Sequence, residues 1–175
     1  MRFRKRKIDQ LVAKILAQYG VRRPPVRVDR LARSLGLEIQ FHPFKNEEGE
    51  QLSGILVREG GKAVLGVNSA DHENRQRFTI AHEIGHFLLH EGDRIFVDRS
   101  YSVSLRGSLS RLGTDLEEIE ANTFASMLLI PEGFLVKDLR DSTVDMEDTE
   151  AIERLARRYR VSPQAMSFRL ANRLQ

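Results

Sequence analysis

The 175-residue sequence contains no cysteine. Its absence excludes disulfide bonds, thiolate metal sites and cysteine nucleophiles together, so any metal ion must be held by histidine and carboxylate side chains. Long apolar runs are also lacking: none approaches the roughly 18 residues that a membrane-spanning helix needs. The basic start at residues 1–7 leads into an amphipathic pattern rather than an apolar block. We therefore expect no secretory signal and a cytoplasmic location.

The composition is that of an ordinary folded domain, with 41% apolar and 30% charged residues. The length suits one domain with a small appendage. We predict a main domain over residues 1–140, which includes N-terminal helices, and a C-terminal helical pair over residues 141–175. The net charge of +3 is mild, and basic and acidic residues alternate along most of the chain, so charge gives little indication of nucleic-acid binding.

The first half of the chain predicts two helices and a small sheet. Apolar residues recur first at helical spacing and then in alternation, which predicts helices at 8–19 and 29–35 and strands at 37–41, 52–58 and 62–68. The last two strands flank Glu59-Gly60-Gly61, which indicates a hairpin. We therefore predict a small antiparallel sheet.

The second half predicts mainly helices. The segment at 93–113 is polar and lacks periodicity, so we expect a long loop there that gates the cleft. Thr114 and Glu117 form a capping-box pattern, and Pro131 interrupts the helix that should begin there. Together with Ser162 as an N-cap, periodicity predicts helices at 72–90, 114–129, 147–159 and 163–173.

His82 and His86 lie four residues apart within the helix predicted at 72–90. Four residues turn a helix by roughly 400°, so both imidazoles lie on one face and can share one ion. Zinc accepts imidazole nitrogens and keeps one position open in catalytic sites, although this kind of donor set also suits manganese. Glu83 flanks the histidine face, where a carboxylate can take a proton from water and deliver it to a leaving amine. Histidines at this spacing also occur by chance, or as ordinary core residues.

A third ligand is required, and the next helix offers acidic candidates. A third histidine six residues after His86 would supply the ligand, but that position is Gly92. His90 lies four residues after His86, but its direction drifts around the helix, so we interpret it as a residue of the helix end. Glu118 shares a face with small residues, which allows that face to approach the metal helix closely, so we favour Glu118 as the ligand. Glu120 lies on a bulkier side of the same helix and is the alternative.

Two further residues are candidates for supporting roles. Asn122 shares the Glu118 face and can hydrogen-bond Glu118 or a ligating histidine; equally, it can satisfy a buried backbone group. Tyr101, in the segment at 93–113, is a candidate oxyanion partner. Gly85 leaves room on the metal helix for substrate or for a closely packed second element.

The combined motifs resemble the ImmA/IrrE family of metallopeptidases. They are FTIAHEIGH at 78–86, which contains an HExxH pattern, EIEANTFA at 118–125 and LLIP at 128–131. The resemblance covers most of the chain, and it implies an α+β, zincin-like fold in which a small sheet packs on the metal helix and an edge strand pairs with an extended substrate. It implies zinc ligands at His82, His86 and Glu118.

The resemblance also implies a regulatory endopeptidase. Such an enzyme makes one site-specific cut in a helix-turn-helix transcriptional repressor and so relieves repression, commonly in stress responses or the control of mobile elements. Its partner would be that protein substrate.

The C-terminal helices support a rival hypothesis. Their spacing resembles a helix-turn-helix, and they are rich in arginine: Arg154, Arg157, Arg158, Arg160, Arg169 and Arg173. The alternative function is a DNA-binding transcriptional regulator whose metal site is structural or vestigial. Acidic residues dilute this charge, so we expect a packed helical pair with a solvated arginine face.

Overall fold

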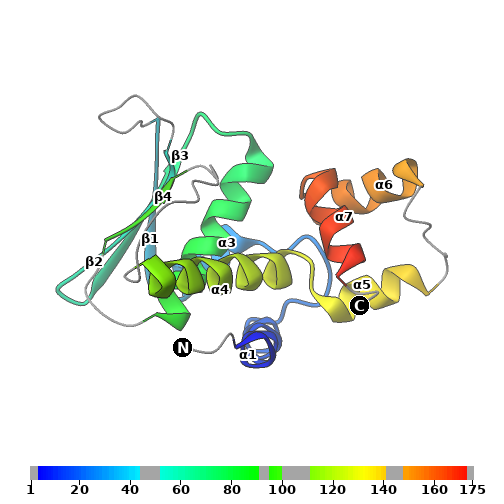
Figure 1. The fold of residues 1–175 in the computed structure, drawn as a ribbon, viewed down its shortest axis with the longest axis horizontal. Helices are drawn as coiled ribbons and strands as arrows, with labels where there is room; N and C mark the ends of the chain where they lie inside the picture. Colours follow the sequence, from blue (N-terminus) through cyan, green and yellow to red (C-terminus); the bar gives the residue numbers. More distant parts are fainter. Residues whose placement is uncertain (1–3, 44–51, 91–94, 100–110, 141–147, 173–175) are drawn as a thin grey trace.

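A computed structural model describes residues 4–43, 52–90, 95–99, 111–140 and 148–172 (Figure 1). These ranges hold seven helices and four strands: α1 (Lys5–Gln18), α2 (Val28–Ser34), β1 (Leu37–His42), β2 (Leu52–Glu59), β3 (Lys62–Asn68), α3 (Glu73–Leu89), β4 (Ile95–Arg99), α4 (Arg111–Leu129), α5 (Glu132–Leu139), α6 (Thr149–Tyr159) and α7 (Pro163–Ala171). The predicted α+β class is confirmed.

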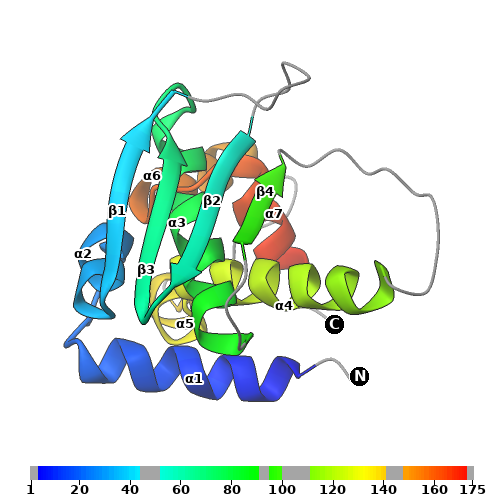
Figure 2. The ribbon, with the colours of Figure 1, turned by 90° about the vertical axis from the view of Figure 1, so that its left-hand side faces the viewer.

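The strands form one sheet in the order β1-β3-β2-β4 (Figure 2). The predicted hairpin of β2 and β3 is confirmed, with antiparallel pairing from Gly54 opposite Val67 to Glu59 opposite Lys62. Its turn uses Gly60 and Gly61, whose φ angles are 56° and 78°. Glycine reaches this left-handed region without a steric penalty, which explains why the two stand together here.

The sheet is mixed, so the prediction of a purely antiparallel sheet is wrong. β1 pairs with β3 in parallel, with Leu37 opposite Ala63 and His42 opposite Asn68. The second strand of the hairpin, β3, lies between β1 and β2, and it runs parallel to β1 and antiparallel to β2. Alternation along each strand identifies the strands, but it contains no information on their order in the sheet.

Two predictions for the segment after α3 are also wrong. The expected loop at 93–113 contains β4, which pairs antiparallel with β2, and α4 begins at Arg111 rather than at Thr114. A five-residue strand is stabilised mainly by hydrogen bonds to its neighbour, which a search for periodicity does not detect. Residues 100–110 lie outside the described part of the chain, so the gating role stays a prediction.

α3 lies between the sheet and α4, and so joins the two halves of the core. It contacts β2 and β3 on one side and α4 on the other. Fully buried residues from all three layers meet there: Leu56, Leu65, Val67, Ile84, Phe124 and Leu128. Apolar burial of this extent is the main force that holds α3 and α4 together.

Gly85 permits the close approach of α3 and α4. A Cβ atom at this position would lie 3.1 Å from the Cα of Ala121 and 3.2 Å from the Phe124 ring. Of the two roles predicted for Gly85, the structure therefore shows packing against a second element. Backbone atoms cannot rotate away as a side chain can, so the spacing of the two helices depends on this glycine.

α4 and α5 form a bent pair around Pro131, which stands at the N-cap of α5. α5 was not predicted, because Pro131 was interpreted only as a helix end, although proline is well tolerated near a helix start. No single helix in the described ranges is long and apolar enough to cross a membrane. By length and composition alone, the pair Leu116–Leu129 and Glu132–Leu139, bent by 44°, meets that condition.

The C-terminal helices, which follow the prediction closely, are anchored by buried polar contacts. Ser162 caps α7 by accepting a hydrogen bond from the amide of Ala165. Arg169 donates to the carbonyl oxygen of Ile130 at 3.1 Å, and the Tyr159 hydroxyl donates to Asp138 at 2.9 Å. These contacts join α7 and α6 to the end of α4 and to α5. The predicted domain boundary falls outside the described residues.

We expect Tyr159→Phe to lower the free energy of unfolding by about 1 kcal/mol, because it removes one hydrogen bond while keeping the buried ring. In this variant Asp138 retains its ion pair with Arg158, with 2.7 Å between Nε and Oδ2, so its carboxylate still has a partner. Urea denaturation measures the change. Tyr19→Phe is the control, because its hydroxyl makes a longer, exposed bond to Ser34. Equal stability of Tyr159→Phe and wild type would contradict the anchoring role.

Candidate metal centre

Three side chains from two helices converge at one point. His82 and His86 come from α3, and Glu118 comes from the first half of α4. The Nε2 atoms of the two histidines are 3.0 Å apart. The carboxylate oxygens of Glu118 lie 3.3 Å from His82 Nε2 and 3.2 Å from His86 Nε2. One donor atom from each residue falls within 4.8 Å of the other two, so the group could hold a metal ion.

The spacing of these donors fits a tetrahedral ion. Ligands at about 2.0–2.1 Å from zinc, in tetrahedral directions, stand about 3.3 Å apart. The Nε2–Nε2 distance of 3.0 Å lies within a few tenths of that value, and so do the distances from His82 to Oε2 (3.3 Å) and from His86 to Oε1 (3.2 Å) of Glu118. Three protein ligands leave a fourth position of the tetrahedron for water or substrate, which is the pattern of catalytic rather than structural zinc sites.

Glu118, the ligand favoured from the sequence, faces the histidines. Burial opposes ionisation of its carboxyl group, but the hydrogen bonds from His82 and His86 outweigh burial and lower its pKa to about 2. The group is therefore a carboxylate at neutral pH. The alternative, Glu120, is fully buried and points elsewhere, because two residues rotate a helix by roughly 200°.

Asn122 orients His82. Its side-chain oxygen lies 3.1 Å from His82 Nδ1, which corresponds to the histidine alternative of the two predicted for this residue. An amide oxygen can only accept, so His82 donates from Nδ1, and this bond holds the ring with Nε2 directed at Glu118 and His86. One turn of helix separates Asn122 from Glu118, and α4 therefore supplies both a donor and a support.

His86 begins a buried chain of contacts that sequence reasoning did not find. His86 Nδ1 lies 3.0 Å from Nδ1 of His90, and His90 Nε2 lies 3.3 Å from a Glu120 oxygen. Arg4 then pairs with Glu120 through two bonds, of 2.6 and 3.0 Å. Burial lowers the pKa of both His86 and His90, which favours neutral rings with lone pairs to share. A sequence signal existed: His90 follows His86 at the helical spacing of four.

Arg58 closes the end of the metal helix, a second role that was not predicted. From β2 it donates to the carbonyl oxygen of His86 at 2.6 Å and to that of His90 at 2.7 Å. The last carbonyl groups of a helix have no partner within the helix and carry partial negative charge, so a guanidinium there is stabilising. The sheet therefore fixes the end of α3 that carries the histidines.

Glu83 is fully buried and faces the sheet rather than α4. A Cβ atom at Gly54 on β2 would lie 3.2 Å from Glu83 Oε1 and 2.4 Å from the Thr79 methyl group. The glycine therefore makes room for the carboxylate between α3 and β2. Glu83 directly follows His82, so its side chain is rotated from that of His82 by roughly 100° about the helix axis, toward β2. Tyr101 lies outside the described residues.

Comparisons with known proteins place this geometry in context. No curated protein matches the chain. A solved structure described as a Mycobacterium tuberculosis transcriptional regulator is similar in fold, with a TM-score of 0.58 and 14% sequence identity. The match covers 92% of this chain and 45% of that one, so this chain spans less than half of the length of the solved structure. The model of the IrrE N-terminal-like domain, Peptidase_M78, matches residues 32–171, which is most of the chain. The chain therefore belongs to the IrrE N-terminal-like family, as its HEIGH and EIEANTFA motifs predicted.

Proposed function

We propose that this protein is a zinc-dependent endopeptidase. The observation that carries the proposal is the convergence of His82, His86 and Glu118 at tetrahedral spacing, with Glu83 on the same turn of α3. Membership of a family whose name includes a peptidase supports it. A site that only stabilised the fold would have no use for a fully buried carboxylate directly after its first ligand.

Each residue has a separate task in the proposed reaction. Zinc held by the three donors would lower the pKa of water to about 7 and polarise the peptide carbonyl group. Asn122 and His90 keep the two imidazoles oriented. Glu83 accepts a proton from water as the water oxygen bonds to the carbonyl carbon, and it then passes this proton to the nitrogen of the leaving amine, so that the C–N bond breaks.

β4 offers a place for an extended substrate. It is an edge strand of the described sheet, because β2 is its single partner among the strands described. An extended peptide that adds to such an edge gains main-chain hydrogen bonds without needing a particular side chain. A fold that already supplies this edge suits an enzyme that recognises a short, unfolded segment of another protein.

For the substrate, we propose a helix-turn-helix transcriptional repressor, cut at one site to relieve repression in a stress response. The resemblance of the motifs to ImmA/IrrE proteins supports this choice, and the fold neighbour is itself described as a transcriptional regulator. The direct test is to incubate the zinc-loaded protein with the repressor encoded beside its gene and to identify fragments by mass spectrometry. One new pair of termini is expected; an intact repressor would count against this substrate.

The alternative of direct DNA binding gains little from the C-terminal helices. Arg158 pairs with Asp138, Arg160 with Glu73, and Arg157 with Glu153. Arg169 is buried against the carbonyl oxygen of Ile130. These four arginines make intramolecular contacts, whereas Arg154 is exposed. A shifted operator fragment at physiological salt, without any cleavage, would favour the alternative.

Glu83→Gln should abolish cleavage and leave metal content unchanged. Glutamine keeps the shape of the side chain but cannot accept the proton, and the loss of a general base costs about 10²–10⁴-fold in rate. Metal content is measured by mass spectrometry of the purified variant, and cleavage by fragment yield. A Glu83→Gln variant that still cut the repressor would remove Glu83 from its assigned role.

Glu118→Gln and Glu120→Gln should separate the ligand from its outer support. Loss of a ligand should weaken zinc binding by more than about 100-fold, whereas outer partners typically contribute about 10–100-fold, so we expect about tenfold for Glu120→Gln. Competition with a chromophoric chelator gives both affinities. The reverse order of effects would assign the third ligand to Glu120.

Gly54→Ala should impair both stability and cleavage. The new methyl group collides with Thr79 and reaches the Glu83 carboxylate, so we expect a destabilisation of about 1–3 kcal/mol and a marked loss of activity with zinc retained. The double variant Gly54→Ala/Thr79→Ser removes the colliding methyl group and should recover stability. If Gly54→Ala matched wild type in melting temperature and rate, the close packing of β2 on Glu83 would be wrong.

A further inference from the structure

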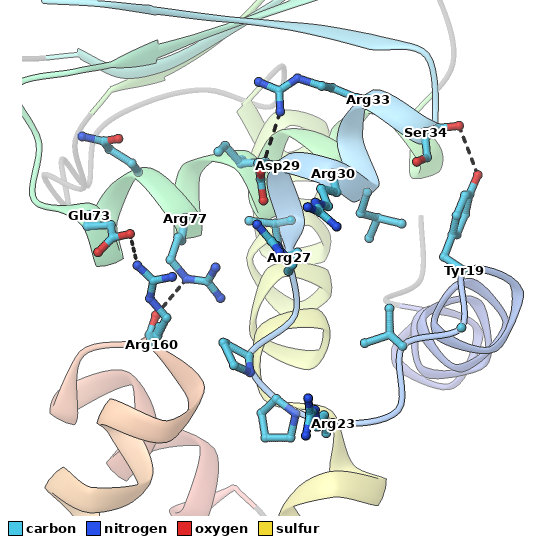
Figure 3. A pocket seen from close by; sticks show the side chains of 18 of the residues that line it. Tyr19, Arg23, Arg27, Asp29, Arg30, Arg33, Ser34, Glu73, Arg77 and Arg160 are labelled. Atoms are coloured by element: carbon cyan, nitrogen blue, oxygen red, sulfur yellow. Dashed lines mark hydrogen bonds and ion pairs between the residues drawn. The ribbon is translucent and has the colours of Figure 1, made fainter.

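A second concave site lies on the side of α3 that is remote from the histidines. This cavity has a volume of about 1000 Å³ and is bounded by the α1–α2 segment, α2, the first turns of α3 and Arg160 after α6. Figure 3 shows side chains that line it. The cavity shares no lining residue with the metal centre. None of the roles proposed for the metal centre requires it.

The lining is strongly basic. Seven arginines face two acidic residues, Asp29 and Glu73. Both acids are already paired, Asp29 with Arg33 at 3.6 Å and Glu73 with Arg160. Among the residues that the structure describes, four exposed lining arginines make no ion pair: Arg22, Arg23, Arg27 and Arg30. The cavity therefore holds a surplus of positive charge.

A fifth arginine is built into the wall. Arg77 on α3 is buried and donates to the carbonyl oxygens of Val26 and Arg160 at 3.0 and 3.1 Å. Burial, reinforced by the neighbouring charge of Arg160, lowers the pKa of its guanidinium group. Arg160 itself adopts the left-handed backbone conformation, with φ of 54°, which positions its carbonyl group against Arg77. Carbonyl partners fix Arg77 in place without cancelling its charge.

Apart from Gly20, Ser34 and Gln76, the remaining lining is apolar and contains two aromatic rings. Val21, Pro24, Pro25 and Leu31 contribute aliphatic surface. Tyr19 is fixed by a hydrogen bond from its hydroxyl group to the carbonyl oxygen of Ser34, and Phe41 is 42% exposed. A ligand that matches this cavity therefore combines several negative charges with a flat, weakly polar group.

We propose that this cavity binds a nucleoside polyphosphate. Arginine pairs with phosphate oxygens through two parallel hydrogen bonds, and aromatic and proline surfaces accept a planar base. Sites for small molecules are concave and commonly have volumes of about 300–1,000 Å³, which fits a nucleotide. Duplex DNA instead requires basic groups on a surface that can follow a groove. The bound nucleotide would contact α2, the turn after α6 and the first turns of α3. Its contact on α3 would be Arg77, five residues before His82.

Calorimetry with the zinc-loaded, full-length protein tests the proposal. ATP should bind with a micromolar dissociation constant, and AMP and inorganic phosphate at least tenfold more weakly, because each has fewer charged oxygens to share among the arginines. Arg27→Ala/Arg30→Ala should weaken ATP binding at least tenfold. The control Arg6→Ala/Arg154→Ala removes the same charge from exposed positions outside the cavity and should bind ATP as wild type does.

Several results would overturn the proposal. They are the absence of ATP binding, equal affinities for ATP, AMP and phosphate, or equal losses in the two double variants. If duplex DNA displaced ATP, and if the Arg27→Ala/Arg30→Ala variant no longer bound that DNA, the arginines would be assigned to nucleic-acid binding instead. Arg27→Gln/Arg30→Gln, checked by thermal melting, separates loss of binding from loss of folding.

Discussion

The packing of α3 against α4 is the constraint on which the site depends. Glu118 meets the histidines because the two helix backbones approach closely at Gly85, where the Cα of Ala121 occupies the space of a side chain. Helices separated by an ordinary side chain would hold the carboxylate too far from the imidazoles to share an ion. Core residues such as Phe124 and Ile84 stabilise this spacing, so the stability of the fold and the geometry of the donors have the same origin.

α3 carries functional side chains on two of its faces. Its face toward α4 carries the metal donors, and its face toward β2 carries Glu83 beneath Gly54. Arg58 reaches across from the sheet to the last carbonyl groups of α3. The proposed base and the donors are consequently fixed by independent neighbours, and a rigid scaffold of this kind maintains catalytic geometry better than a loop does.

Local patterns in the sequence predicted the parts of this arrangement that depend on local spacing. The i, i+4 relation of His82 and His86, the Glu118 face of α4 and the Gly60–Gly61 turn follow from the repeat of a helix or the twist of a hairpin. Strand order, β4 and α5 do not, since each is decided by a neighbour far along the chain. The contact of Arg4 with Glu120 spans 116 residues, and no periodicity reveals such a pair.

Arg4 immediately precedes α1. Its guanidinium group contacts Glu120, Glu120 contacts His90, and His90 contacts His86. The entrance to the first helix is therefore part of the environment of the metal centre. Replacing Arg4 would remove the cation paired with Glu120, which is itself the partner of His90 Nε2. The chemical environment of His90, and through it of His86, therefore depends on a residue outside both helices that carry the donors.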